Sequence, residues 1–298
     1  MEYSLLGKSD LRVSRIGFGC MSLKGTEKEN SDLLHKALES GINFFDTADL
    51  YNHGDNEIVV GKTLKDIRSH VIIATKVGNQ WRKDGSGWDW NPNKKYILQA
   101  AEESLERLQT DYIDLYQLHG GTINDPIDET IEAFELLKQQ GKIRYYGISS
   151  IRPNVIREYI KRSHIISVMM QYSLLDRRPE ETCLDLLKEN NTGVLARGTV
   201  AQGLLINKPA KEYLGYSKDQ VALAAKAIQS VSNDQRRETP TAIGFVLQHP
   251  AITNVVAGIR TMEQLEEAIK TTSSPTLSEK EMQALQHAIP INYYSEHR

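Results

Sequence analysis

Four residues whose side chains can transfer or orient protons follow short apolar runs in the first half of the chain. Asp46 follows Ile-Asn-Phe-Phe, and Tyr51 comes shortly after it in Asp-Thr-Ala-Asp-Leu-Tyr. Lys76 follows Val-Ile-Ile-Ala-Thr, and His119 follows Tyr-Ile-Asp-Leu-Tyr-Gln-Leu. A phenol has a pKa of about 10, and a nearby ammonium lowers that pKa because its charge favours the phenolate. A carboxylate can hold the ammonium, and an imidazole can orient a carbonyl oxygen, so the set predicts a proton-transfer site.

Eight apolar, strand-like runs alternate with helical patterns along the chain. The runs lie near residues 14–18, 42–45, 71–75, 112–118, 143–149, 165–170, 193–196 and 253–257. The helical patterns include residues 31–40, 56–66, 94–108, 127–140 and 153–162. Near-continuous apolar strands need cover on both faces, so this order predicts an α/β fold, a parallel sheet closed into a (β/α)8 TIM barrel. Residues 5–13 are predicted to form an N-terminal β-hairpin that closes the bottom of the barrel. The four residues then fall at the carboxyl ends of strands, where such barrels carry their chemistry.

Length and composition set the class of protein. Barrels of this kind commonly reach 298 residues as one unit, and no linker breaks the alternation, so we expect a single domain over residues 1–298. With a net charge of -3, no long apolar stretch and no export signal, we expect no nucleic-acid partner, no membrane and a cytoplasmic location. Cys20 and Cys183 are the only cysteines and have no ligand spacing, so neither a disulfide framework nor a structural zinc is expected.

Six short segments, taken in their order and spacing, carry a resemblance to a known family. They are residues 17–22, 45–51 with Asn56 and Glu57 after them, 74–76, 111–119, 141–149 and 202–205. The chain resembles the aldo-keto reductases, in particular bacterial reductases grouped with general stress proteins and, more distantly, potassium-channel beta subunits. The resemblance implies a (β/α)8 barrel that binds NADPH and reduces aldehydes or ketones. It further implies that Tyr51 gives its proton to the carbonyl oxygen, with support from Lys76 and Asp46. His119 would orient that oxygen.

The resemblance also assigns residues to the nicotinamide and phosphates. Ser149 and Gln171 match the positions that bind the carboxamide, with Ser150 in place of the usual asparagine. Arg197 replaces an aromatic ring that stacks on the nicotinamide, and Thr199 replaces a proline. A guanidinium repels an oxidised nicotinamide, so we expect Arg197 to turn to the pyrophosphate or a carboxylate and to disfavour NADP+. The other matched positions are Gly19, Cys20, Met21, Asp46, Gly198, Val200, Gln202, Gly203 and Lys208.

The adenosine end of the cofactor is expected near residues 255–268. The strand there ends at Gly258, whose backbone can approach a phosphate at the start of the next helix. Arg260 offers a planar fork suited to a 2'-phosphate, which favours NADPH over NADH. By resemblance, Gln264 and Glu267 contact the adenosine, whereas an alanine replaces the asparagine that usually follows them.

All three tryptophans lie between residues 81 and 90, in a glycine-bearing loop after the third strand-like run. This loop could fold over the barrel mouth, where Trp81 and Trp88 would form an apolar wall with Met21 opposite. Packing of these rings on neighbouring helices is the open alternative. With Tyr51 and His119, the wall would form the substrate site. Without an arginine clamp for a carboxylate, it favours uncharged aldehydes or ketones.

Two further functions stay open at this point. A nicotinamide-nucleotide sensor or regulatory protein, similar to the channel beta subunits, would be compatible with the altered cofactor positions. The intact set of four proton-transfer residues favours an enzyme instead. A metal-dependent hydrolase on the same barrel would need clustered His and Asp ligands at the strand ends, which the sequence lacks. We expect a monomer or a weak homo-oligomer.

Overall fold

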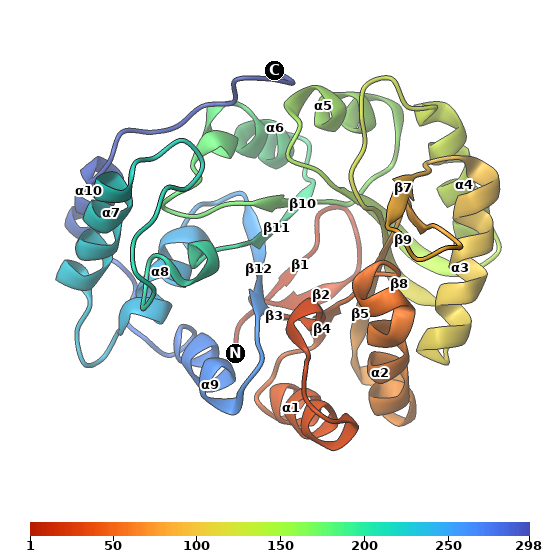
Figure 1. The fold of residues 1–298 in the computed structure, drawn as a ribbon, viewed down its shortest axis with the longest axis horizontal. Helices are drawn as coiled ribbons and strands as arrows, with labels where there is room; N and C mark the ends of the chain where they lie inside the picture. The colour runs from red at the N-terminus through yellow and green to blue at the C-terminus, as the bar shows by residue number, and fades with distance from the viewer.

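The computed structural model describes residues 1–298, and its centre is a closed barrel of eight parallel strands with helices around it (Figure 1). The strands follow one another around the barrel in sequence order, and the last pairs with the first. They are β3 (Ile16–Gly19), β4 (Phe44–Asp46), β5 (Ile72–Val77), β8 (Ile113–Leu118), β9 (Ile143–Ser149), β10 (Ser167–Gln171), β11 (Gly193–Arg197) and β12 (Ile252–Gly258). Each overlaps one of the eight predicted runs, so the predicted (β/α)8 TIM barrel is confirmed.

Side chains on each strand alternate between two apolar cores. Phe44 and Leu115 belong to the smaller core, which fills the inside of the barrel. Phe45 and Tyr116, each one residue further along, belong to the larger core between the strands and the helices. Successive residues of a strand point to opposite faces, so a barrel covered by helices needs apolar residues at nearly every position. This explains why the strands appear in the sequence as continuous apolar runs.

The predicted N-terminal hairpin is present and closes one end of the barrel. Strands β1 (Tyr3–Leu5) and β2 (Arg12–Ser14) pair antiparallel, and Leu6, Leu11 and Val13 enter the inner core. The turn between the strands packs against the chain just before β10 and β11. At Gly7, which has φ +56°, a Cβ atom would lie 2.2 Å from the carbonyl oxygen of Ile166. The hairpin therefore closes the end at which the strands begin.

Ten α-helices surround the strands, and the five helices predicted above are among them. They are α1 (Glu27–Glu39), α2 (Asp55–Leu64), α3 (Lys94–Leu108), α4 (Ile127–Gln139), α5 (Pro153–Arg162), α6 (Cys183–Glu189), α7 (Lys218–Val231), α8 (Glu238–Leu247), α9 (Met262–Lys270) and α10 (Glu279–His287). Helix α1 begins at Glu27 rather than at residue 31, because Thr26 and Glu29 form a capping box ahead of the apolar pattern. None of the helices combines the length and apolar character that a bilayer-spanning helix requires.

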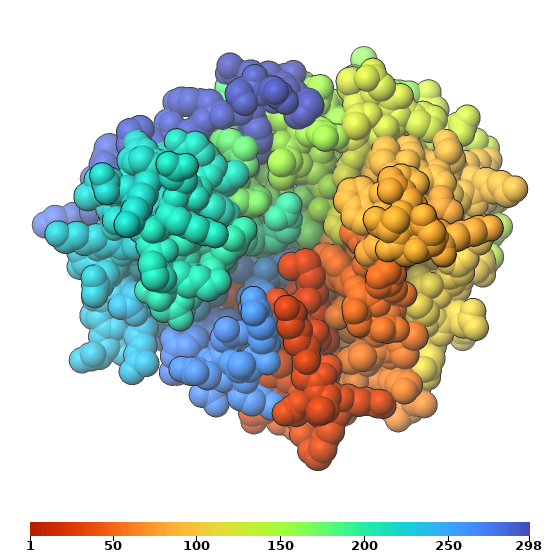
Figure 2. All heavy atoms as spheres, viewed as in Figure 1, coloured from red at the N-terminus to blue at the C-terminus, as the bar shows by residue number.

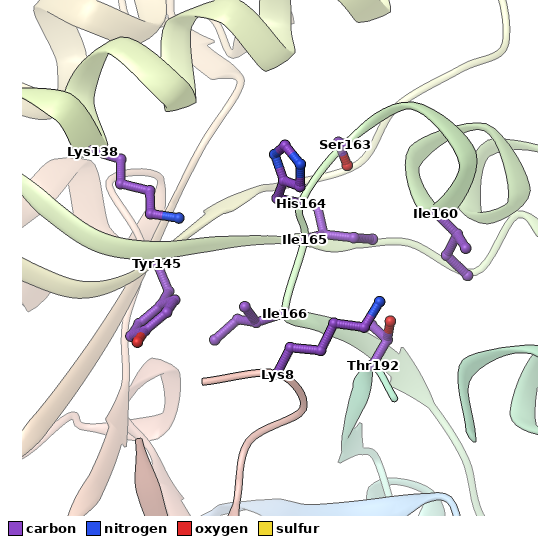
Figure 3. Close-up of a pocket in the computed structure, with 9 residues that line it drawn as sticks. All are labelled: Lys8, Lys138, Tyr145, Ile160, Ser163, His164, Ile165, Ile166 and Thr192. Carbon is purple, nitrogen blue, oxygen red and sulfur yellow. The ribbon is translucent and has the colours of Figure 1, made fainter. Parts of the chain in front are cut away.

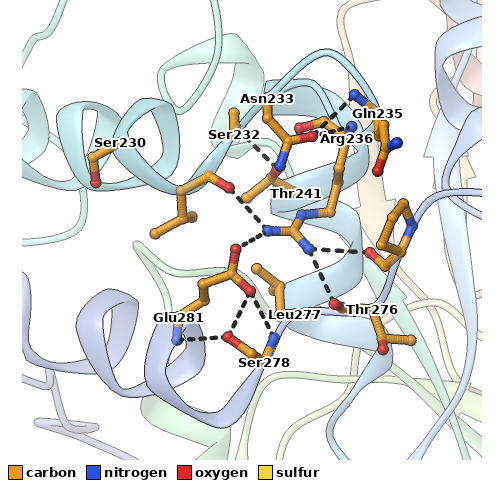
Figure 4. Close-up of polar contacts among 12 residues, drawn as sticks. Ser230, Ser232, Asn233, Gln235, Arg236, Thr241, Thr276, Leu277, Ser278 and Glu281 are labelled. Carbon is orange, nitrogen blue, oxygen red and sulfur yellow. Dashed lines mark hydrogen bonds and ion pairs between the residues drawn. The ribbon is translucent and has the colours of Figure 1, made fainter.

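A buried arginine joins the helices on one side of the barrel. The guanidinium of Arg236, between α7 and α8, donates to the carbonyl oxygens of Val231, Pro275 and Thr276 and pairs with Glu281 of α10 (Figure 4). Arg236 is only 3% exposed. Its charge is balanced by a carboxylate and by carbonyl oxygens, as a buried cation requires. The α7–α8 connection is thereby tied to α10.

The ends of the strands opposite the hairpin are covered by loops and by short 3-10 turns. A second hairpin, β6 (Asn79–Trp81) and β7 (Trp88–Trp90), follows β5, and a long segment between β11 and α7 lies over the same end. Figure 2 shows this face hollowed near its centre, between the segments coloured red and orange and those coloured green and teal. The 3-10 turns are η1 (Cys20–Ser22), η2 (Tyr51–Gly54), η3 (Lys65–His70), η4 (Arg178–Glu181) and η5 (Ala201–Gly203).

Candidate active site

Neighbouring strands bring the four proton-transfer residues to one end of the barrel. Asp46 is the last residue of β4, and Tyr51 begins the η2 turn that follows. Lys76 lies near the end of β5, and His119 comes directly after β8. Strands β4, β5 and β8 are adjacent and parallel, so their carboxyl ends meet at the same edge. Side chains far apart in sequence thus share one small volume.

Lys76 is the centre of this cluster and is fully buried. Its Nζ donates to Oδ2 of Asp46 at 2.7 Å, to the carbonyl oxygen of Thr47 at 2.7 Å and to the hydroxyl of Tyr51 at 3.2 Å. An ammonium has three N–H donors, and all three are used here. The side chain of Lys76 therefore has a single arrangement, in which one donor addresses the phenol oxygen.

Burial and charge act in opposite directions on Lys76. Burial lowers its pKa, but the neighbouring Asp46 and Tyr51 outweigh burial and raise the pKa of Lys76 above its ordinary value. For Asp46, burial raises the pKa of the carboxyl, and the Lys76 ammonium opposes that rise. The close ion pair is the reason that a lysine can stay charged inside the barrel.

The pKa of Tyr51 differs from the sequence-based expectation. The ammonium of Lys76 lowers this pKa, as expected, but burial raises it by more, and Asp46 adds to the rise. The net result is a phenol with a raised pKa, because loss of water penalises the phenolate more than one ammonium compensates. Tyr51 is therefore fully protonated at neutral pH, which is the form that a proton donor needs.

The imidazole of His119 lies against Tyr51, with 5.9 Å between ring centroids and 84° between ring planes. Burial, with smaller contributions from Lys76 and Arg197, lowers the pKa of His119 to about 3. The ring is therefore neutral at physiological pH. Its Nδ1 is buried without a hydrogen-bond partner, and Asn79 Nδ2 donates to its backbone carbonyl at 3.1 Å. A neutral imidazole can donate one N–H to a carbonyl oxygen without repelling Lys76.

Several residues that support Tyr51 were not predicted. Asn52 and His53, directly after Tyr51, have φ of 49° and 55°, which is uncommon for residues other than glycine. His53 stacks on Trp81 of the β6–β7 hairpin, with 3.7 Å between ring centroids and 24° between planes. The spacing of residues in the sequence does not predict the stacking of His53 on Trp81. Positive φ at residues with side chains is the kind of backbone strain that clusters at functional sites.

A short chain of hydrogen bonds connects the strand ends behind the site. Thr47 Oγ1 donates to Asn56 Oδ1 at 2.7 Å, and Asn56 Nδ2 donates to the carbonyl oxygen of Cys20 at 2.8 Å. Cys20 is fully buried, and its Sγ donates to the carbonyl oxygen of Phe18 at 3.8 Å. Gly19 lies beside Gly258 in the pairing of β3 and β12, and Met21 is 63% exposed above them.

The residues expected to face the nicotinamide end β9, β10 and β11, which are adjacent. Ser149 is nearly buried, and the Ser150 hydroxyl accepts from the backbone N–H of Arg152 at 3.2 Å, so it serves the local turn. Gln171 Nε2 donates to the hydroxyl of Tyr213 at 2.7 Å, and Gln171 Oε1 accepts from Arg197 Nη1 at 3.3 Å. Arg197 forms no ion pair here, so its partner is an amide rather than the expected carboxylate.

The expected phosphate loop follows β11 and has a strained backbone. Gly198, Ala201, Gln202 and Gly203 have φ of 71°, 47°, 59° and 93°. The loop curls so that the backbone N–H of Lys208 donates to the Gly203 carbonyl at 3.0 Å, and the Lys208 side chain lies against Gly203. The other members, Thr199, Val200 and Gln202, lie within this same curl. A glycine-bearing loop with a nearby lysine suits a pyrophosphate.

The expected adenosine side begins at helix α9. Thr261 caps this helix, because its hydroxyl accepts from the backbone N–H of Gln264. The side chain of Gln264 accepts from the backbone N–H of Arg260 at 2.9 Å, and the exposed Arg260 guanidinium forms no hydrogen bond or ion pair. Glu267 pairs with Lys270 at 2.9 Å. A free guanidinium at a helix N-terminus fits a phosphate group.

The tryptophan loop forms the β6–β7 hairpin, and its three rings have different surroundings. Trp81 stacks on His53, next to Tyr51, whereas Trp88 is 47% exposed at the tip side of the hairpin. Trp90 packs inward, and its Nε1 donates to Asp125 Oδ2 at 3.0 Å. The hairpin is closed by the ion pair of Arg82 with Asp89. A substrate wall formed by Trp81 and Trp88 stays a prediction.

A cavity at the opposite end carries none of the predicted residues. It has a volume of about 270 Å³ and lies where β10 and β11 begin (Figure 3). Its lining includes Lys8, Tyr145, His164 and Thr192. In this structure, no group of three or more His, Cys, Asp or Glu side chains could hold a metal ion. The strand ends around Lys76 are therefore the candidate site, because buried side chains that can transfer protons contact one another there.

Comparisons with known proteins show which family the chain belongs to. The Aldo/keto reductase family model matches residues 15–290. The uncharacterized oxidoreductase YqkF of Bacillus subtilis (strain 168) is 52% identical over 100% of both chains, and the NADH-specific methylglyoxal reductase of Escherichia coli (strain K12) is 29% identical over 89% of this chain and 91% of that one. The holo form of aldo-keto reductase AKR11C1 from Bacillus halodurans is similar in structure, with a TM-score of 0.93 and 50% identity over 100% of this chain and 99% of that one. The chain is an oxidoreductase that belongs to the aldo/keto reductase family.

Proposed function

We propose that this protein uses NADPH to reduce aldehydes or ketones to alcohols, with Tyr51 as the general acid. The observation that carries the proposal is the triple hydrogen bonding of Lys76, which aims one ammonium donor at the Tyr51 hydroxyl while Asp46 holds the charge. A buried ammonium needs an acceptor for each N–H, and the Tyr51 hydroxyl is the one acceptor of the three that can also release a proton.

The roles of the four side chains follow from their geometry. A reduced nicotinamide, when bound, supplies the hydride that the carbonyl carbon accepts. Tyr51 gives its phenolic proton to the carbonyl oxygen, and Lys76 stabilises the phenolate that remains. Asp46 keeps Lys76 charged and oriented. His119, neutral and adjacent to Tyr51, donates an N–H to the carbonyl oxygen as negative charge develops there.

The choice of NADPH over NADH rests on Arg260. Its guanidinium is exposed, has no partner and lies at the start of α9, where a 2'-phosphate would add two charges to bind. The Escherichia coli relative is described as NADH-specific, so cofactor choice differs within the family. Lys208, which lies beside the curled phosphate loop, is proposed to add charge near the phosphates.

The proposed substrate is an uncharged aldehyde or ketone. Trp81 stacks on His53 next to Tyr51, and the exposed Trp88 and Met21 are proposed to add apolar surface that binds apolar substituents of the substrate. Arg197 is the nearby cation, and the nicotinamide is proposed to lie between it and the reacting carbon. The same arginine supports preference for the reduced cofactor over the oxidised one.

Two observations favour a second candidate, a nicotinamide-responsive sensor whose turnover is incidental. Arg197 stands where an aromatic ring would stack on the cofactor, and Ser150 is occupied by a local turn. Both features weaken the hold on the nicotinamide. A sensor needs to bind the cofactor and can turn it over slowly. An enzyme needs both cofactor binding and rapid turnover.

The test is NADPH oxidation by the purified protein with a panel of aldehydes and ketones. Tyr51→Phe removes the proton while leaving a similar ring in place, and we expect turnover to fall at least about a hundredfold with little change in NADPH affinity. Tyr293→Phe, at an exposed tyrosine, is the matched control. Equally slow turnover in the wild-type protein and in Tyr51→Phe would instead support the sensor.

A further inference from the structure

We infer that Tyr213 is a positioning residue for the nicotinamide, because its hydroxyl holds the Gln171 amide in one orientation. The inference rests on the proposed nicotinamide-dependent function and extends it to a residue outside every motif of the sequence. Tyr213 lies in the segment between β11 and α7, beyond the curled phosphate loop. Its hydroxyl accepts the 2.7 Å hydrogen bond from Gln171 Nε2.

The two neighbours of Gln171 leave its amide only one orientation. A guanidinium can only donate, so the amide atom 3.3 Å from Arg197 Nη1 must be the oxygen. The amide nitrogen must then face Tyr213, whose hydroxyl accepts its hydrogen bond. A glutamine with a single neighbour could present either end of its amide. The second lone pair of Oε1 is left for an N–H of the cofactor's carboxamide.

The stem of Gln171 is held as well. Gly198 of the phosphate loop has φ +71°, and a Cβ atom there would lie 3.2 Å from Gln171 Cγ. The loop backbone therefore packs on the side-chain stem, at a distance that only glycine allows without displacement. Gln171 also pairs in register with Arg197 across β10 and β11. Both the stem and the two ends of the amide thus have fixed neighbours.

Tyr213 is itself fixed by a tight turn. Backbone hydrogen bonds link Tyr213 and Tyr216 in both directions, at 3.1 and 2.9 Å, and the Tyr216 hydroxyl donates to the Pro290 carbonyl at 2.7 Å. Between them, Leu214 has φ +48°, which is unfavourable for a side chain larger than glycine. Leu214 is 38% exposed, so its own packing does not account for this conformation. Leu214 and Gly215, with φ of 48° and 85°, form a tight two-residue turn, and this turn fixes the position of Tyr213.

A side chain that is ordered before the ligand arrives lowers the entropy lost on binding. Removing the Tyr213 hydroxyl should therefore weaken binding of the nicotinamide end and leave the adenosine end unaffected. A purely structural role for the turn would weaken both ends alike. If the Tyr213 hydroxyl instead competed with the cofactor for Gln171, its removal would tighten binding.

The experiment compares two probes on three proteins. The probes are NADPH and 2'-phospho-ADP-ribose, which lacks the nicotinamide, and the proteins are the wild type, Tyr213→Phe and Tyr293→Phe. We expect the Kd of NADPH to rise about fivefold in Tyr213→Phe, the value of one hydrogen bond, with no change for 2'-phospho-ADP-ribose. Tyr293→Phe should leave both values unchanged. An unchanged or lower Kd for NADPH, or equal weakening of both probes, would overturn the inference.

Two further comparisons distinguish the inference from a folding defect. In a Gln171→Ala background, Tyr213→Phe should have no additional effect on NADPH binding, since both changes act through one contact. Gly198→Ala should weaken NADPH binding, whereas Gly85→Ala, with a similar φ of +72° and no atom near its Cβ, should not. If Gln171→Ala and Tyr213→Phe weakened NADPH binding additively, the two residues would not act through one contact. A wild-type protein that neither binds nor oxidises NADPH would refute the proposed function, whereas an active wild type with an unaltered Tyr213→Phe refutes only this inference.

Discussion

The ring of His119 stands edge-on to the ring of Tyr51, at 5.9 Å between centroids, and shares its buried surroundings with Lys76. A cationic imidazole in that place would lie beside an ammonium, away from water. The pKa of His119 is accordingly lowered to about 3. The buried cluster therefore places a neutral imidazole, not a second cation, next to the phenol and the Lys76 ammonium.

This relationship predicts how the stability of the protein depends on pH. The folded-state pKa of His119 lies below its unfolded value of about 6.5, so the folded form binds the proton less well. The stabilisation is fully present above pH 6.5 and is lost as pH falls from about 6.5 toward about 3. By about pH 5 the loss should be about 2 kcal/mol, measured by urea unfolding of the wild type against His119→Asn. An identical pH dependence in the two proteins would contradict a buried, neutral His119.

Variants at the Lys76–Asp46 ion pair should affect the stability of the protein and its turnover differently. Lys76→Met leaves the Asp46 carboxylate buried without a partner, which should cost about 3–5 kcal/mol of unfolding free energy. Adding Asp46→Asn removes the stranded charge and should restore a large part of that stability. Turnover should stay at least about a hundredfold below wild type in both variants, because the Tyr51 phenolate has lost its ammonium. Recovery of turnover in the double variant would exclude this role of Lys76.

Arg260 should decide between the two nicotinamide cofactors. Arg260→Gln removes the charge-assisted hydrogen bonds to a 2'-phosphate, so the KM for NADPH should rise about ten- to a hundredfold while that for NADH stays unchanged. Arg157→Gln, at an exposed arginine of α5, provides the control. Steady-state kinetics with one aldehyde and both cofactors make the comparison. Equal changes in KM for NADPH and NADH would show that Arg260 does not determine cofactor specificity.

Arg197 should shift the balance between oxidised and reduced cofactor. Its guanidinium contributes positive potential at Tyr51, Asp46 and His119, so it lies close to the place proposed for the nicotinamide ring. Arg197→Tyr removes repulsion of the oxidised ring and supplies a stacking surface, so NADP+ should bind about tenfold more tightly relative to NADPH. Fluorescence titration of each variant with both forms tests this ratio. Equal affinities for the two forms in the wild-type protein would argue against any role of the charge.

Much of the architecture could be predicted because its causes are local. A strand covered on both faces must be apolar at nearly every position, so Val-Ile-Ile-Ala-Thr before Lys76 indicates a barrel strand without further information. The same logic placed Asp46, Lys76 and His119 at strand ends. Helix α1 began earlier than its apolar pattern because the capping box of Thr26 is polar.

The pKa of Tyr51 and the packing of its neighbours depend on contacts between segments that are distant in sequence, which local patterns do not predict. The sequence indicated that Lys76 would lower the pKa of Tyr51, but only the folded chain shows how much water is removed, and burial outweighs the ammonium. The stacking of His53 on Trp81 arises because the β6–β7 hairpin folds back over the η2 turn.

The amino-acid sequence by itself determined the barrel, the strand ends and the chemical types that gather there, since periodicity and residue chemistry are properties of short segments. The tertiary structure decided how far each pKa shifts and which side chains form hydrogen bonds with one another. Desolvation and hydrogen-bond direction depend on every neighbour in space, which is why Tyr213, distant in sequence from Gln171, was visible only in the folded chain.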